Sequence, residues 1–178
     1  IAAGVGSFVP KTLKIDGMEA LVGHSVHYHP ADVAHLALQG QQVLVHGGDE
    51  LAVQAALDAL TQHPASVTLM HRRDVFTAPQ PLLDALAAHR SAGRIQVLAA
   101  QPVALQANGT QLHCVQVSLP DGSTHTVPAQ QWLLYQGISP KLGPIADWGL
   151  ALVKKQLPVD TGTFVTEAPG IYAVGDIN

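Results

Sequence analysis

Cysteine is nearly absent from this chain: Cys114 is the single one among 178 residues. One thiol excludes an intrachain disulfide and any C-x-x-C dithiol, and so little cysteine is typical of a protein of the reducing cytoplasm. Cys114 lies in an alternating apolar run over residues 112–119. This run predicts a small side chain packed in a β-strand rather than a reactive thiol.

Charge is also scarce, at 12% of the residues, and the formal net charge is −4. The sequence therefore offers no electrostatic basis for binding nucleic acid or an anionic membrane. No apolar run has the length of a spanning helix and no signal-peptide pattern opens the sequence, so we expect no membrane contact. Because Ile1 opens directly on strand-like residues, we expect the sequence to be a segment of a longer chain.

Hydrophobic residues, in contrast, make up 47% of the chain, so a sizeable core is available. The length of 178 residues allows one domain, or one domain with parts of another. Two apolar runs, residues 43–45 and 66–70, flank a glycine turn and an alanine-rich helical pattern over residues 49–61. A strand, a glycine turn, a helix and a second strand are typical of the βαβ unit that binds dinucleotides. Asp49 is placed to cap this helix, because its carboxylate can accept a free backbone N–H of the first turn.

The second strand ends at His71, Arg72 and Arg73. In a unit that binds NAD, an acidic side chain at this place accepts the 2′-hydroxyl of the ribose, whereas two guanidinium groups offer planar forks to a 2′-phosphate. Arg72 and Arg73 therefore predict that the βαβ unit prefers NADP to NAD. The alternative is a βαβ unit whose glycine turn and arginines are merely solvated.

The glycine turn departs from the G-x-G-x-x-G/A pattern, whose frame falls on His46, Gly48 and Leu51. Gly48 keeps the middle position, where the backbone approaches the pyrophosphate. His46 replaces the first glycine, and Leu51 replaces the small residue that allows close packing of helix and strand. The frame one residue later, which begins at Gly47, loses the middle glycine and fits less well.

After the βαβ unit the periodicity changes from helical to alternating. A helical pattern over residues 82–93 and a short strand over residues 95–98 come first. Turns at Asn108-Gly109 and Asp121-Gly122 then separate three antiparallel strands, and a return strand follows: residues 103–105, 112–119, 125–127 and 132–135. The sequence predicts an α/β fold, a Rossmann-like three-layer dinucleotide-binding domain with a parallel sheet plus an antiparallel β-meander.

Several motifs carry a family resemblance: IAAGVGSFVP at residues 1–10, HRRDVF at 71–76, GISPKLGPIADWGL at 137–150 and IYAVGD at 171–176. With these motifs the chain resembles, over its whole length, the ferredoxin–NADP reductases of thioredoxin-reductase-like type. This group lies within the pyridine nucleotide–disulfide oxidoreductase superfamily.

The resemblance implies a division into three segments. Residues 1–24 would be a segment of an FAD domain and a hinge, residues 25–137 the NADPH-binding domain, and residues 138–178 the return segment of the FAD domain. The implied full-length protein uses FAD and NADP, passes hydride from NADPH to the flavin and passes electrons on to ferredoxin or flavodoxin. It would be a cytoplasmic homodimer. The chain alone is expected to be colourless and inactive.

The expected contacts of the cofactors follow from the βαβ unit and from the family's motifs. No residue stands out as an acid, base or nucleophile, and no metal is expected. The expected cofactor-binding residues are His46, Gly47, Gly48, Asp49, Glu50, His71, Arg72, Arg73, Gly137, Gly175 and Asp176.

Besides His46 and Leu51, a third departure from the family's pattern bears on function, and the lack of a cysteine pair separates the chain from the thioredoxin reductases. Thr77 stands where the phosphate motif commonly has another arginine, a loss of about 1.5–3 kcal/mol of nucleotide binding. Residues 26–32 carry no cysteine at the place of the thioredoxin reductases' C-x-x-C pair. Without a dithiol, electrons must pass from the flavin directly to an external acceptor.

Histidines cluster at His24, His27, His29 and His35, and His27 and His29 could share one face of a strand as a metal pair. Asp32 could contribute, but no cysteine or pair of carboxylates completes the set, so surface or hinge histidines are favoured over a zinc site. A Ser/His/Asp hydrolase has no support, because no G-x-S-x-G sequence occurs.

Two alternatives to the ferredoxin reductase remain open. One is an NADPH reductase of the same fold with another acceptor, such as a quinone or a small disulfide. The other is a non-catalytic domain that has lost nucleotide affinity through its altered glycine turn and serves as a scaffold or sensor.

Overall fold

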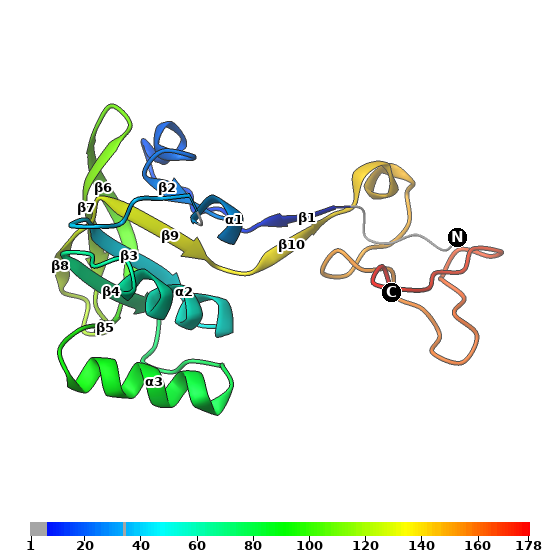
Figure 1. Cartoon of the computed structure of the whole chain (residues 1–178). Coiled ribbons are helices and arrows are strands. Elements are labelled where there is room, and N and C mark those ends of the chain that lie inside the picture. Colours follow the sequence, from blue (N-terminus) through cyan, green and yellow to red (C-terminus); the bar gives the residue numbers. More distant parts are fainter. Residues whose placement is uncertain (1–6, 34) are drawn as a thin grey trace. The chain divides into compact units, whose positions relative to one another are not determined.

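The computed structural model describes residues 7–33 and 35–178 and divides them into two compact units (Figure 1). The larger unit contains residues 11–137, and the smaller contains residues 7–10 together with residues 138–178. Residues 1–6, with which the strand-like residues and the motif IAAGVGSFVP begin, lie outside the described residues.

A five-stranded parallel sheet forms the centre of the larger unit, with the strand order β2-β9-β3-β4-β5. The central strand β3 is followed in the chain by β4 and β5 on one side, and β9 returns on its other side. The strands are β2 (Val26–His27), β3 (Gln42–Gly47), β4 (Ser66–His71), β5 (Gln96–Ala99) and β9 (Gln131–Tyr135). Since both faces of the sheet are covered, β3, β4 and β9 are apolar along most of their length.

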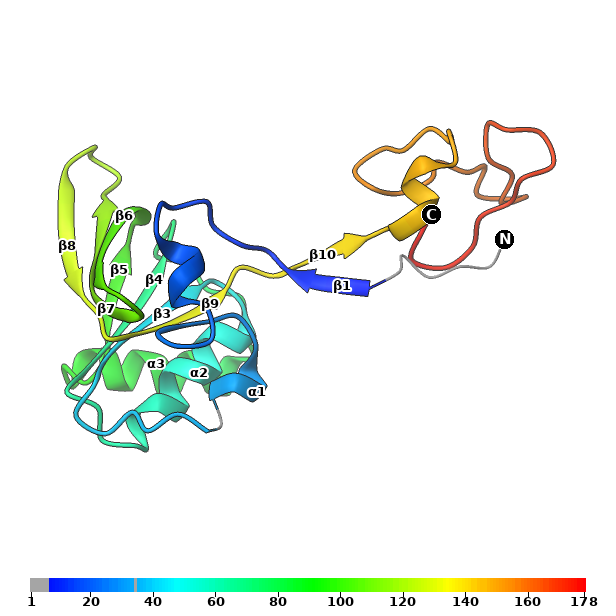
Figure 2. The same ribbon diagram turned by 90° about the horizontal axis from the view of Figure 1, so that it is seen from above.

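Helices cover one face of this sheet, as Figure 2 shows. They are α1 (Pro30–Val33), α2 (Glu50–Leu60) and α3 (Gln80–Ser91). The core on this side joins the buried alanines of α2 to side chains of β3, β4 and β9, among them Val45, Leu69 and Leu133. Small residues on α2 allow the helix to approach the sheet closely.

A three-stranded antiparallel sheet covers the other face (Figure 2). It contains β6 (Gln101–Asn108), β7 (Gln111–Ser118) and β8 (Thr124–Pro128). Val115 and Val117 of β7 share a core with Leu44 of β3 and with Trp132 and Leu134 of β9. The predicted three-layer α/β fold with its meander is thus confirmed.

Residues 11–24, which the sequence grouped with the first segment, lie in the larger unit instead. The 3-10 helix η1 (Met18–Leu21) explains this difference. Met18 and Leu21 are buried in the same core as Trp132 of the parallel sheet, so this stretch cannot be separated from that core.

The smaller unit has little regular structure. Strand β1 (Ser7–Pro10) pairs antiparallel with β10 (Ile138–Lys141), and the 3-10 helix η2 (Gly143–Asp147) follows. In the segment that carries the motif IYAVGD, Tyr172 pairs with Val165 through an antiparallel bridge.

Candidate functional site

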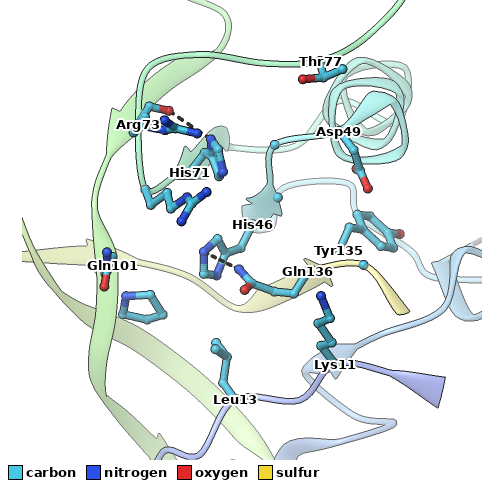
Figure 3. A pocket seen from close by; sticks show the side chains of 15 residues that line it. Lys11, Leu13, His46, Asp49, His71, Arg73, Thr77, Gln101, Tyr135 and Gln136 are labelled. Carbon is cyan, nitrogen blue, oxygen red and sulfur yellow. Dashed lines mark hydrogen bonds between the residues drawn. The ribbon is translucent and has the colours of Figure 1, made fainter. Parts of the chain in front are cut away.

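An open pocket of about 720 Å³ lies in the larger unit at the carboxyl ends of β3, β4 and β9 (Figure 3). In parallel α/β sheets ligands bind at this edge, at the point where successive strands diverge to the two sides of a central strand. Here β4 and β9 flank β3 on opposite sides, so the pocket lies at that point. Its lining includes Arg72, Arg73 and the glycine turn after β3.

Asp49 caps helix α2 at the side of the pocket, because its Oδ1 accepts a hydrogen bond from Ala52 N at 3.1 Å. The first turn of α2 presents its remaining backbone N–H groups at this end. A helix N-terminus with free N–H groups favours an anion such as a phosphate. The expected cap is therefore present, at the edge of the pocket.

Gly47 makes the close approach between strand and helix that the turn requires. A Cβ atom at Gly47 would lie 2.4 Å from the carbonyl oxygen of Tyr135 and 2.7 Å from Ala52 Cβ. Ala52 is fully buried, whereas Leu51 is 41% exposed. The expectation that position 51 sets the helix–strand packing is therefore wrong: Gly47 and Ala52 form this contact, in the frame that the sequence disfavoured.

Gly48 lies directly against the imidazole of His71. A Cβ atom at Gly48 would fall 2.5 Å from His71 Cε1, so the missing side chain makes room for this ring. The ring is fixed from its other edge, since His71 Nδ1 lies 3.1 Å from the carbonyl oxygens of both Arg73 and Val75. His71 thus connects the glycine turn with the arginine segment (Figure 3).

We call residues 72–77, which follow β4, the arginine loop. Arg72, Arg73 and Thr77 line the pocket. The loop returns to the glycine turn, where Thr77 N donates to the carbonyl oxygen of Gly48 at 2.8 Å. Figure 3 shows Thr77 beside the beginning of α2, so the position of the absent third arginine faces the same pocket.

His46 lies beneath the pocket and is 3% exposed. Its ring stacks on Trp132 with centroids 6.3 Å apart, and its Nε2 lies 2.7 Å from the side-chain amide of Gln136. Burial and the nearby His71 lower the pKa of His46 to about 4. His46 is therefore neutral at neutral pH and adds no positive charge for a phosphate.

Further residues line the pocket that the sequence did not single out: Lys11, Leu13, Gln101, Pro102, Tyr135 and Gln136. Gln136 directly follows β9, and the rule that ligands bind at the carboxyl ends of parallel strands points to it once β9 is placed beside β3. Lys11 gives no such signal. It comes from an irregular segment and reaches the pocket because its backbone N–H donates to Gly137 O at 3.0 Å.

The structure brings together most, though not all, of the expected cofactor-binding residues. Glu50 begins α2 and is exposed outside the pocket lining. Gly175 and Asp176 belong to the smaller unit and form no part of this pocket. The expected residues that line it are His46, Gly47, Gly48, Asp49, His71, Arg72, Arg73 and Gly137.

The histidine cluster forms no metal centre among residues 7–33 and 35–178, where no three metal-ligating side chains converge. The expectation of a surface or hinge side chain is wrong for His27, which is buried in β2 with its Nε2 3.0 Å from Gln131 Oε1. Within the same described ranges, no helix has the length and apolar character needed to cross a membrane.

Comparison with known proteins agrees with this architecture. A ferredoxin–NADP reductase of Acidovorax sp. (strain JS42) is 53% identical over 181 residues, covering the whole of this chain and 51% of that protein. The ferredoxin–NADP reductase of Verminephrobacter eiseniae (strain EF01-2) is 48% identical over 183 residues, covering the whole of this chain and 52% of that protein. The chain thus spans about half the length of these relatives.

Among solved structures, the thioredoxin reductase of Lactococcus lactis superposes with a TM-score of 0.76 at 26% identity, covering 99% of this chain and 56% of that one. The sequence profile of the pyridine nucleotide-disulphide oxidoreductases matches residues 1–178. The expected resemblance to thioredoxin-reductase-like ferredoxin–NADP reductases is confirmed, and the chain belongs to the pyridine nucleotide-disulphide oxidoreductase family.

Proposed function

We propose that the larger unit binds NADPH as part of an FAD-dependent oxidoreductase that passes electrons to ferredoxin or flavodoxin. The observation that carries this proposal is the pocket itself. It combines the N-terminus of α2 with Arg72 and Arg73, at the edge of a parallel sheet where dinucleotides bind. The names of the relatives support ferredoxin as the acceptor.

Each part of NADPH has a chemically suitable partner in the pocket. The pyrophosphate would lie at the glycine turn, where the N–H groups at the start of α2 favour an anion. The 2′-phosphate would lie at the arginine loop, whose exposed Arg72 and Arg73 can each form charge-assisted hydrogen bonds. Neutral His46 below the turn would shape the site without adding charge.

For FAD, the smaller unit offers the turn Gly175-Asp176, in which Gly175 has a φ of 92° and the Asp176 side chain is exposed. This glycine conformation and a free carboxylate suit a turn that accepts a hydrogen bond from a flavin cofactor. When bound, the flavin would accept hydride from NADPH and release electrons singly. The remainder of the FAD site, and assembly into a homodimer, would belong to the full-length protein.

The chain itself offers no dithiol that could relay electrons between a bound flavin and an acceptor. Its one cysteine, Cys114, lies on β7 in the antiparallel sheet and has no second cysteine with which to form a disulfide. No pair of cysteines in this chain could therefore carry electrons from a bound flavin to an acceptor. This favours a one-electron carrier over a substrate reduced through a protein dithiol.

Calorimetric titration of the chain with NADPH and with NADH tests the proposal. We expect NADPH to bind at least about tenfold more tightly, because only it can use the arginine loop. Arg72→Ala should remove most of this preference, whereas Arg94→Ala, an exposed arginine outside the pocket, should leave it unchanged. Equal affinities of the parent chain for the two nucleotides would refute the proposal.

A further inference from the structure

Asp74 lies in the arginine loop immediately after Arg72 and Arg73, and it is held by an ion pair from another element. Arg90, in the last turn of α3, donates from Nη1 to Asp74 Oδ1 at 3.0 Å and from Nη2 to Asp74 Oδ2 at 2.8 Å. Both oxygens of the carboxylate are thus engaged by one guanidinium in a two-pronged geometry. About half of each side chain remains exposed, at 50% for Arg90 and 46% for Asp74.

A carboxylate at this position acts against phosphate binding. If Asp74 were unpaired, it could neutralise the neighbouring arginines by pairing with Arg72 or Arg73, and it would repel a phosphate dianion at the same loop. The bond to Arg90 turns the carboxylate towards α3 and balances its charge. The hydrogen bond and the negative charge of Asp74 in turn raise the pKa of Arg90, which stays protonated throughout the physiological range.

The shape of the arginine loop has other supports. His71 Nδ1 lies 3.1 Å from the carbonyl oxygens of Arg73 and Val75, inside the loop. At its end, Thr77 N donates to Gly48 O at 2.8 Å. Since these contacts hold both halves of the loop independently of Arg90, we expect the loop to keep its shape when the ion pair is broken. The expected effect of the ion pair is on the distribution of charge.

We propose that Arg90 is a specificity-determining positioning residue: by holding Asp74, it leaves Arg72 and Arg73 available for the 2′-phosphate of NADPH. Arg90 itself does not line the pocket. The inference rests on the proposed binding of NADPH in that pocket. It adds that selectivity between NADPH and NADH depends on a residue of α3, outside the nucleotide site.

A double-mutant cycle on the chain tests this role. Calorimetry with NADPH and NADH is carried out at low ionic strength for the parent, Arg90→Gln, Asp74→Asn and the double variant. Arg90→Gln should weaken NADPH binding about two- to fivefold, the range of a half-exposed charge pair, and leave NADH binding unchanged. The double variant should recover the parent's NADPH affinity or exceed it, because the freed carboxylate is removed with its partner.

Arg94→Gln is the matched control, because it removes an equal charge three residues beyond α3 without touching Asp74. It should change neither affinity, and added salt should diminish the effect of Arg90→Gln. The proposal is overturned if Arg90→Gln weakens NADPH and NADH equally, if it weakens neither, or if the double variant stays as weak as Arg90→Gln. A parent chain that does not prefer NADPH would instead refute the nucleotide site itself.

Discussion

Gly47 and Gly48 are adjacent, yet each lacks a side chain for a different reason. At Gly47 a Cβ atom would meet backbone, the Tyr135 carbonyl at 2.4 Å, whereas at Gly48 it would meet the side chain of His71 at 2.5 Å. We therefore expect Gly47→Ala to lower the free energy of unfolding by about 1–3 kcal/mol, because strand and helix must separate. Gly48→Ala should cost less stability and should instead weaken NADPH binding by displacing His71.

Urea unfolding and calorimetry of the two variants separate these effects. A Gly47→Ala variant as stable as the parent would contradict the close approach of Gly47 to Ala52 of α2 and to the Tyr135 carbonyl. Equal losses of stability in both variants would show that the His71 ring cannot move to make room for a Cβ atom at position 48.

His46 makes the stability of the chain depend on pH. Its pKa is lowered to about 4 from the ordinary 6.5, so the unfolded chain takes up this proton more readily than the folded one. Acidification from pH 6.5 to pH 4 should thus remove stability on the order of 3 kcal/mol, while no change from this residue is expected above pH 6.5.

The contribution of His46 is isolated by comparison with a variant that lacks only this ionisable group. His46→Gln keeps a side chain able to bond with Gln136 but has no proton to gain. Urea unfolding at a series of pH values should show a shallower loss for His46→Gln. Parallel curves for the two proteins would mean that His46 is not neutral in the fold.

Substitution of Thr77 by arginine should increase the affinity of the site for NADPH. Thr77 lines the pocket beside the glycine turn, and its structural bond to Gly48 uses the backbone N–H, which any substitution except proline keeps. Thr77→Arg should raise NADPH affinity about tenfold through one more charge-assisted bond to the 2′-phosphate, with NADH little affected. Thr77→Gln, which lengthens the side chain without charge, should give no comparable increase in calorimetric titrations.

At the scale of elements, the capped helix α2 gives a matched pair of variants. Asp49→Ala removes the bond from Ala52 N and a negative charge at the N-terminus of α2, and should cost about 1 kcal/mol of stability. Asp58→Ala removes the same charge near the other end of the helix, where a carboxylate opposes the helix dipole. Asp58→Ala should leave the free energy of unfolding in urea nearly unchanged. Equal losses of stability in the two variants would argue against a stabilising cap at Asp49.

The elements that the sequence predicted are those whose residues carry a local signal. The unit from β3 to β4 has uninterrupted apolar strands and an N-cap, and its structure agrees closely with the prediction. Strand β6 is longer than the sequence predicts. Register shifts at Pro102/Ala104 and Gln106/Ala107 interrupt the alternation of side chains that marks a strand, so the sequence pattern indicates only part of β6. The pairing of β1 with β10 joins distant segments and has no local signal.

The residues of the candidate site could likewise be predicted only where they follow elements with a local sequence signal. Arg72, Arg73 and the glycine turn follow strands with clear patterns, so their meeting at one edge of the sheet could be inferred. The sequence could not show which residue of α2 packs against the glycine turn, because only the orientation of the helix decides whether Leu51 or Ala52 faces the strand. The ion pair between Asp74 and Arg90 depends on where α3 lies against the loop, a tertiary relation that the sequence does not encode locally.

At the scale of the whole molecule, the two units differ greatly in buried apolar surface. The larger unit has a continuous core on each face of its parallel sheet. Among the residues that the structure describes, the core of the smaller unit contains four buried apolar side chains, Leu142, Leu157, Ala173 and Ile177. Large apolar side chains of that unit are instead exposed: Ile138, Trp148, Val153, Phe164, Tyr172 and Val174. Since burial supplies most of the stabilising free energy, the smaller unit should be much less stable.

Hydrogen exchange measured by mass spectrometry tests this difference. Amides of β3, β4 and β9 should exchange at least about a hundredfold more slowly than those of residues 142–178, which open without disturbing the larger core. NADPH should slow exchange further in the arginine loop and at the start of α2, because a bound nucleotide stabilises only the state that binds it. Comparable protection of residues 142–178 would mean that this segment is held by contacts beyond its four-residue core. Protection by NADPH there, and not in the arginine loop, would place the nucleotide in the smaller unit.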